Sequence, residues 1–166
     1  MSEHLNPWSL AEEAIEEYLT ASRSCLDYKK QDSGCLGYPS VLLLLCIVNA
    51  LGTYLRNEDV IIEGKKQQIT RGKPFRVLNH PLFKQDLTDA QIGRIEEASR
   101  NRLAHNALID PGVVLTPVTT GFAFKFTDND DVWISVPVLH AVVADAWTHF
   151  DKSKIKYAIE AFRLSG

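Results

Sequence analysis

The chain of 166 residues has little cysteine and no excess of positive charge. Its three cysteines, Cys25, Cys35 and Cys46, lack Cys-x-x-Cys spacing, which argues against a disulfide scaffold or a closed zinc site and fits a reducing cytoplasm. A net charge of −3 excludes a protein that is basic throughout, so any contact with nucleic acid must come from a local patch. The hydrophobic share of 45% and the length indicate one globular domain over residues 1–166.

Long hydrophobic runs are also scarce. Residues 33–55 carry no charge, but only the eight residues Val41–Val48, VLLLLCIV, are continuously apolar. A membrane span needs about 20 apolar residues, so this segment predicts a helix at the centre of a protein core and no membrane contact. No cationic start precedes an apolar stretch at the N-terminus, so no secretory signal is expected. We therefore expect a cytoplasmic protein.

Helical periodicity is the main pattern that the chain does contain. It covers four regions, residues 8–30, 39–56, 88–109 and 137–162, with a break in the last near Asp151. The third begins with a capping-box pattern, Thr88 followed by Gln91. Residues 57–73 are predicted to form a loop, and residues 75–84 a short helical turn interrupted at Pro81. The predicted fold is mainly α, an antiparallel bundle of four to five helices.

A two-residue period interrupts the helices before the last region. Phenylalanine alternates with other residues in GFAFKF, as aliphatic residues do in VWISV, and the turn between them is rich in Asp and Asn. This pattern predicts a small β-hairpin within an insertion at about 113–136, with residues 113–118 as a further candidate strand.

Several common catalytic motifs are missing: serine elbows, glycine-rich phosphate loops, His-Glu-x-x-His and paired cysteine ligands. We accordingly expect no metal and no cofactor. One polar group stands out in the third helical region, where SRNRLAHN contains Arg100, Asn101 and His105. On a helix Asn101 and His105 are one turn apart and share a face, and Arg94 extends the same polar stripe.

The spacing of Arg100 and His105, with Asn101 after the arginine, resembles the R-x4-6-H signature of the HEPN superfamily. The resemblance implies a helical bundle and a metal-independent endoribonuclease that acts as a homodimer, with two motifs facing each other. It also implies a toxin or anti-phage setting with a possible antitoxin protein as partner. Ala107 stands where toxins paired with a nucleotidyltransferase antitoxin often have tyrosine, so modification at that site is excluded.

These residue types suit RNA cleavage. The 2′-hydroxyl of RNA can attack the adjacent phosphate once a base removes its proton, and histidine can act as that base or as the acid. Arg100 would stabilise charge on the phosphorane and Asn101 would orient its neighbours by hydrogen bonds. The alternative is a non-catalytic HEPN-like module that binds a nucleotide, an RNA or a protein. A helical scaffold with an interacting hairpin, in which Trp133 matters most, is a further alternative.

A local run of positive charge is the second candidate feature. Residues 65–84 contain six basic residues and no acidic residue; the basic residues are Lys65, Lys66, Arg71, Lys73, Arg76 and Lys84. Such a run is able to dock an RNA backbone, and it also suits a polar loop that only keeps the surface hydrated. We take Lys65, Lys66, Arg71, Lys73 and Arg94 as the candidate RNA-binding residues.

Overall fold

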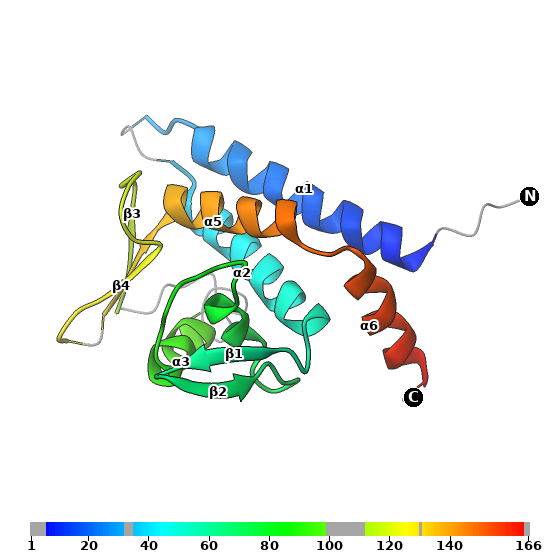
Figure 1. The fold of residues 1–166 in the computed structure, drawn as a ribbon. Coiled ribbons are helices and arrows are strands. Elements are labelled where there is room, and N and C mark those ends of the chain that lie inside the picture. Colours follow the sequence, from blue (N-terminus) through cyan, green and yellow to red (C-terminus); the bar gives the residue numbers. More distant parts are fainter. Residues whose placement is uncertain (1–5, 32–34, 99–111, 130, 165–166) are drawn as a thin grey trace, which may run out of the picture.

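A computed structural model describes residues 6–31, 35–98, 112–129 and 131–164, and these are mainly α-helical (Figure 1). The helices are α1 (Pro7–Asp27), α2 (Gly37–Tyr54), α3 (Asp89–Glu97), α5 (Val136–His149), α6 (Ser153–Leu164) and the short 3-10 helix η1 (Pro74–Asn79). The strands are β1 (Asp59–Ile62), β2 (Lys65–Gln68), β3 (Val113–Thr116), β4 (Phe124–Phe126) and β5 (Val132–Ser135). The prediction of a mainly α fold is confirmed.

Helix α2 is the central element of the core. Its apolar run is buried on several sides, against α1, α5, α6 and η1, and Val41, Leu44 and Leu51 are completely inaccessible to solvent. Among the described helices, α2 is long and apolar enough to cross a membrane. Its position explains that composition, because a helix with neighbours on most sides needs apolar residues around most of its circumference.

Helix α1 covers one side of α2, and α5 runs beside both (Figure 1). Asn6 caps α1 by accepting a hydrogen bond from the backbone N–H of Trp8. Pro7 occupies the first turn, where its missing N–H costs no hydrogen bond within the helix. Ser22 of α1 and Ser40 of α2 are both fully buried, with their hydroxyl oxygens 2.8 Å apart. Each buried hydroxyl thus supplies the partner that the other needs.

The segment predicted as a loop over residues 57–73 is a β-hairpin, so that prediction was wrong. Strands β1 and β2 pair antiparallel, from Asp59 opposite Gln68 to Ile62 opposite Lys65. Glu63 and Gly64 form the turn with φ values of 51° and 73°, as a two-residue type I′ turn requires. Only Val60 and Ile62 of β1 turn inward. Two buried residues in an otherwise polar segment form too short an alternating pattern to predict a strand.

The hairpin leads into η1, which is attached directly to α2. Its side chains Phe75, Val77 and Leu78 are buried in the core. A Cβ atom on Gly52 of α2 would overlap the carbonyl oxygen of Pro74, so the two backbones meet where only glycine leaves room. The predicted helical turn in this region is present as η1, and it ends before Pro81.

The predicted hairpin before the last helices is present and belongs to a three-stranded sheet. Strand β5 lies in the middle, antiparallel to β4 and parallel to β3. Ser135 ends β5 and caps α5. Helix α5 ends at His149, and α6 begins at Ser153. The break predicted near Asp151 is therefore confirmed, while a four- to five-helix bundle of the HEPN type stays a prediction.

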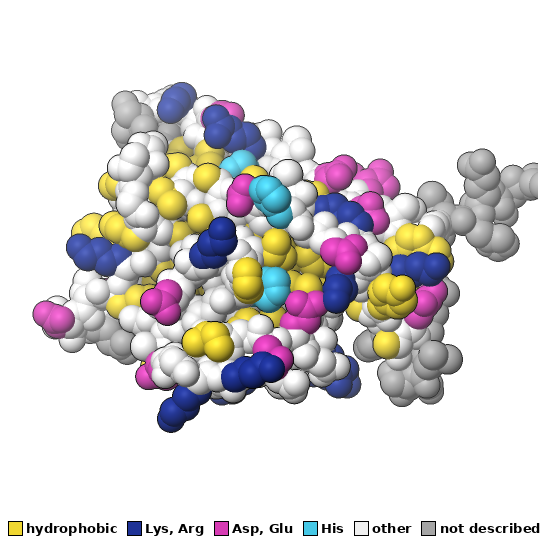
Figure 2. Space-filling model, in the orientation of Figure 1, with side chains coloured by type: hydrophobic (Ala, Val, Ile, Leu, Met, Phe, Trp, Pro, Cys, Tyr) yellow, Lys and Arg dark blue, Asp and Glu magenta, His cyan; other side chains and the backbone are white. Residues whose placement is uncertain are grey.

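The visible surface carries mixed charge. Figure 2 shows Lys and Arg side chains interspersed with Asp and Glu on this face, with no large area of one sign. Local pairing of charges therefore decides what each basic residue does.

Candidate functional site

The predicted catalytic residues Arg100, Asn101 and His105 lie outside the described residues, as does the rest of the segment from Ser99 to Pro111. The described chain leads toward them through α3. Thr88 caps this helix with the predicted capping box, in which Gln91 bonds back to the cap, and Ile92 and Ile95 are buried. The site built from described residues lies elsewhere.

The predicted RNA-binding residues come from several elements. Lys65 and Lys66 lie on β2, Arg71 lies in the turn after it, Lys73 precedes η1, and Arg94 is half-buried on α3. Lys66 pairs with Asp59 at 2.7 Å, and Lys73 pairs with Asp89 at 2.7 Å. The run over residues 65–84 therefore contains cations such as Lys66 and Lys73 that have a carboxylate partner, and others, such as Arg71, that form no ion pair within the described part of the chain.

Asp89 is the centre of the paired group. Its carboxylate accepts hydrogen bonds from Lys73 Nζ and, at 3.1 Å, from Arg76 Nε, while Arg76 Nη1 donates to the carbonyl oxygen of Gln68 at 3.0 Å. The hydrogen bonds from Lys73 and then Arg76 lower the pKa of Asp89. Asp89 is also the first residue of α3, where negative charge is favourable. This cluster joins the hairpin to α3 and is structural.

A pocket of about 530 Å³ opens between the end of α2, the hairpin and α6. Figure 1 shows the end of α2 between these two elements. The lining residues are Thr53, Tyr54, Arg56, Asn57, Glu58, Thr70, Arg71, Lys154, Tyr157, Ala158 and Ala161. They include three cations and one carboxylate. The four from α6 occupy positions i, i+3, i+4 and i+7, counted from Lys154, and therefore share one face of that helix.

A β-bulge shapes the wall of this pocket. The N–H of Asn57 donates to the carbonyl oxygen of Ile69, and the N–H of Ile69 donates to the carbonyl oxygen of Glu58, both at 2.9 Å. Two residues of one strand thus face one residue of the other, and Asn57 has the positive φ of 73° that such a bulge needs. The bulge ends the β1–β2 ladder and directs Glu58 toward the interior side of the hairpin.

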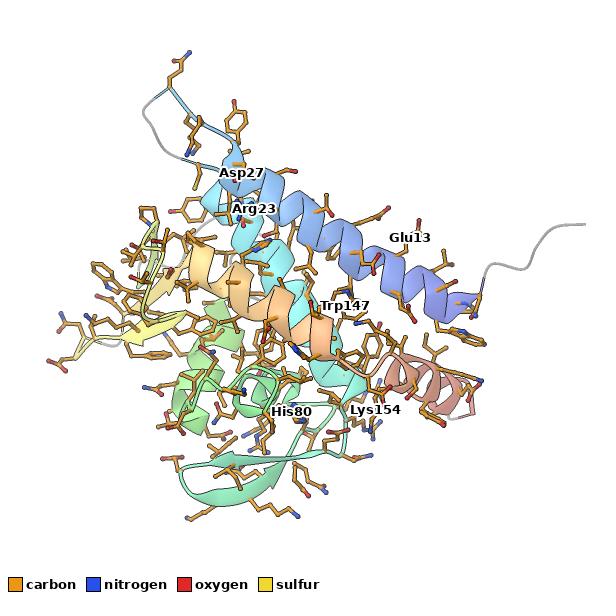
Figure 3. The ribbon with its side chains drawn as sticks, turned by 45° about the horizontal axis from the view of Figure 1, so that its top comes forward. Glu13, Arg23, Asp27, His80, Trp147 and Lys154 are labelled. Carbon is orange, nitrogen blue, oxygen red and sulfur yellow. The ribbon has the colours of Figure 1, made fainter. Side chains whose placement is uncertain are left out.

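Glu58 joins three parts of the chain. Its Oε1 accepts a hydrogen bond from Lys154 Nζ of α6 at 2.7 Å, and its Oε2 lies 3.1 Å from His80 Nε2. Figure 3 places His80 and Lys154 beside the hairpin. Burial acts to raise the pKa of Glu58, but the hydrogen bonds from Lys154 and His80 together outweigh it and lower that pKa. The carboxylate is therefore kept ionised.

The His80–Glu58 pair has a positioning role in this structure. His80 Nδ1 accepts the backbone N–H of Leu82 at 3.3 Å, so Nε2 carries the proton that is donated to Glu58. Both ring nitrogens of His80 thus have partners within the protein. The pair fixes Glu58, which in turn fixes Lys154 at the pocket.

Neither a metal-binding cluster in the described residues nor a match to a known protein points to a function for this site. Among the residues that the structure describes, no group of three or more His, Cys, Asp or Glu side chains is arranged to hold a metal ion. No family model, curated protein or solved structure matches this chain.

Sequence reasoning identified one residue of the pocket, Arg71, and missed Arg56, Lys154 and Tyr157. Arg56 follows the end of the apolar helix, and Lys154 and Tyr157 lie 98 and 101 positions further along the sequence. The three- and four-residue spacing on α6 was visible, but only the packing of α6 beside the hairpin turns that face into a pocket wall.

Proposed function

We propose that this chain is a metal-independent endoribonuclease of the HEPN type that acts as a homodimer. The observation that carries the proposal is the motif Arg100-Asn101-x3-His105. The expected number of chance occurrences of this motif in a chain of this composition is roughly 0.03. Further support comes from α3, which begins at Thr88 as the periodicity predicts and leads into the motif.

In the proposed reaction, one His105 removes the proton from a ribose 2′-hydroxyl. The 2′-oxygen forms a bond to the adjacent phosphorus, and the bond from phosphorus to the 5′-oxygen breaks. The histidine of the second copy gives a proton to that leaving oxygen, and Arg100 stabilises the negative charge on the phosphorane. Asn101 orients the histidine or the phosphate. The products are a 2′,3′-cyclic phosphate and a 5′-hydroxyl.

Two-fold symmetry supplies both an acid and a base from one motif, which is why the proposal includes a homodimer. The resemblance on which it rests supports a cytoplasmic toxin or anti-phage protein, with RNA as substrate and a possible antitoxin protein as inhibitor. Growth arrest on expression, reversed by Arg100→Ala, is the expected cellular result.

The proposal is tested by cleavage of end-labelled RNA with the purified full chain in the presence of EDTA. We expect cyclic-phosphate products, and we expect His105→Ala and Arg100→Ala to reduce the rate by about 10²–10⁴-fold. Matched controls are His149→Ala and Arg23→Ala, because both side chains are well exposed on other helices. Full cleavage by His105→Ala, or complete inhibition by EDTA, would contradict the proposal.

A further inference from the structure

The cations that line the pocket differ in their partners. Lys154 is held by Glu58 at 2.7 Å. Arg56 and Arg71 are both exposed, and within the described part of the chain no carboxylate forms an ion pair with either. Two guanidinium groups thus face a shared pocket, and no carboxylate of the described residues pairs with them.

We propose that this pocket binds a phosphate-bearing nucleotide, with Arg56 and Arg71 holding the phosphate and Tyr157 contacting the base. The inference does not depend on the proposed nuclease activity, because it is argued from Arg56, Arg71 and Tyr157, which do not belong to the motif. The phosphate can belong to a free nucleotide or to an RNA strand, and the experiment below separates the two sources.

The charge and geometry of the pocket favour a phosphate. A guanidinium group donates two parallel hydrogen bonds to phosphate oxygens, and two such groups match a dianion better than a single carboxylate. The Thr70 side chain lies at the same wall and offers a hydroxyl donor. The one acidic lining residue, Glu58, already shares its charge with Lys154 and His80, which reduces its repulsion of an anion.

The size and the aromatic wall favour a ring attached to that phosphate. The volume of about 530 Å³ lies within the range of small-molecule sites. Tyr157 is 66% exposed although it faces this pocket from α6, so its ring is available for stacking. Tyr54 forms a second, half-buried wall, and its ring is fixed against Phe150 at a centroid distance of 6.4 Å.

The arginines are placed by backbone features that need no ligand. Arg56 follows the last turn of α2, immediately before the bulge at Asn57 and Glu58. Arg71 lies in the turn from Thr70 to Lys73, which is closed by a 3.0 Å hydrogen bond between these two residues. The ladder bonds to Ile69 keep both turns at the same end of the hairpin. The pocket is therefore formed before binding.

Calorimetric titration of the full chain tests the proposal. The probes are ADP, AMP, adenosine, inorganic phosphate, succinate and a six-residue single-stranded RNA, the last with a His105→Ala background so that it is not cut. We expect ADP to bind and adenosine and succinate to bind at least tenfold more weakly. Arg56→Ala and Arg71→Ala should each weaken ADP binding by about tenfold or more, the usual effect of losing a charged hydrogen bond.

Two matched variants sharpen the result. Lys30→Ala removes an exposed cation after α1 that does not line the pocket, and it should change the ADP affinity less than twofold. Tyr157→Ala should weaken ADP and leave binding of inorganic phosphate unchanged. A variant that unfolds at the same temperature as the wild type is folded. If Arg56→Ala or Arg71→Ala is not folded, Arg56→Lys or Arg71→Lys takes its place.

The titrations with ADP and with the RNA show which source the phosphate has. Arginine-dependent binding of ADP supports a free nucleotide, and arginine-dependent binding of the RNA alone supports an RNA strand. Equal binding of succinate and ADP, equal loss in Lys30→Ala and Arg71→Ala, or failure of both ADP and the RNA to bind would overturn the proposal. Loss of RNA cleavage in His105→Ala with normal ADP binding leaves it intact and keeps the two proposals separate.

Discussion

The two sides of the β1–β2 hairpin use basic residues in opposite ways. On the side of η1, Lys73 and Arg76 share the carboxylate of Asp89. On the side of the pocket, Arg56 and Arg71 lack such a partner among the described residues. Both pairs come from the same stretch of chain, within 21 positions.

The difference shows that a run of positive charge in a sequence is not in itself a binding surface. Arg76 is only 12% exposed, and a guanidinium group at that depth needs a partner to offset its loss of hydration. Arg71 lies at the tip of a turn, where water replaces such a partner until an anion binds. The first side should therefore govern stability and the second side binding.

The closest backbone contact on the η1 side gives the largest expected effect. Gly52→Ala introduces a Cβ into the space taken by the carbonyl oxygen of Pro74, and neither backbone can move without disturbing the core. We expect a loss of about 3 kcal/mol in the free energy of unfolding, typical of severe overpacking. Urea denaturation followed by circular dichroism measures it.

Gly93 provides the matched control, because it is also a helical glycine but has open space around its Cβ position. Gly93→Ala should stabilise the protein by about 0.5–1 kcal/mol, through the higher helix propensity of alanine. Equal effects of the two substitutions would show that η1 does not pack against α2 as closely as described.

Asp89→Ala is expected to have the second largest effect. It removes the partner of the half-buried Arg76 and a favourable negative charge from the first turn of α3. We expect a loss of about 2 kcal/mol in unfolding free energy. Asp59→Ala is the control, since its partner Lys66 is 70% exposed and an exposed pair contributes at most about 1 kcal/mol. A smaller loss for Asp89→Ala than for Asp59→Ala would remove the distinction between the two sides.

The helices were predictable because each has a signal within its own residues. The apolar run of α2, the capping box at Thr88 and the proline near the start of α5 all mark local preferences that packing retains. Strands β1 and β2 were missed since each has four residues and their pairing depends on a turn, Glu63-Gly64, that gives little signal without its partners. Local patterns therefore gave the helical elements, and short polar strands required the tertiary structure.

The candidate site divides in the same way. Arg71 was selected for its charge, but nothing in its surroundings distinguished it from Lys73, because the difference is made by Asp89, 16 residues from Lys73. Lys154 was not selected, since its partner Glu58 is 96 positions away. The motif at Arg100 and His105 was recognisable because all of its members fall within one short segment, and its chemistry stays a prediction.

The smallest expected effect concerns acid stability on the pocket side. Hydrogen bonds from Lys154 and His80 outweigh burial and lower the pKa of Glu58 in the folded state. The unfolded chain therefore binds a proton more readily than the folded one, and the stabilisation is complete above the ordinary glutamate pKa of about 4.3 and is lost as pH falls through the lowered value. Urea denaturation should show that the free energy of unfolding of Glu58→Gln falls less steeply than that of the wild type between pH 5 and pH 3. At pH 7 the two free energies should differ by at most about 1 kcal/mol.

Asp89→Asn is the comparison from the η1 side, because the pKa of Asp89 is lowered in the same direction. An unchanged slope in Glu58→Gln together with a shallower slope in Asp89→Asn would mean that only the η1 side depends on its ionised carboxylate, and that Lys154 reaches the pocket without help from Glu58.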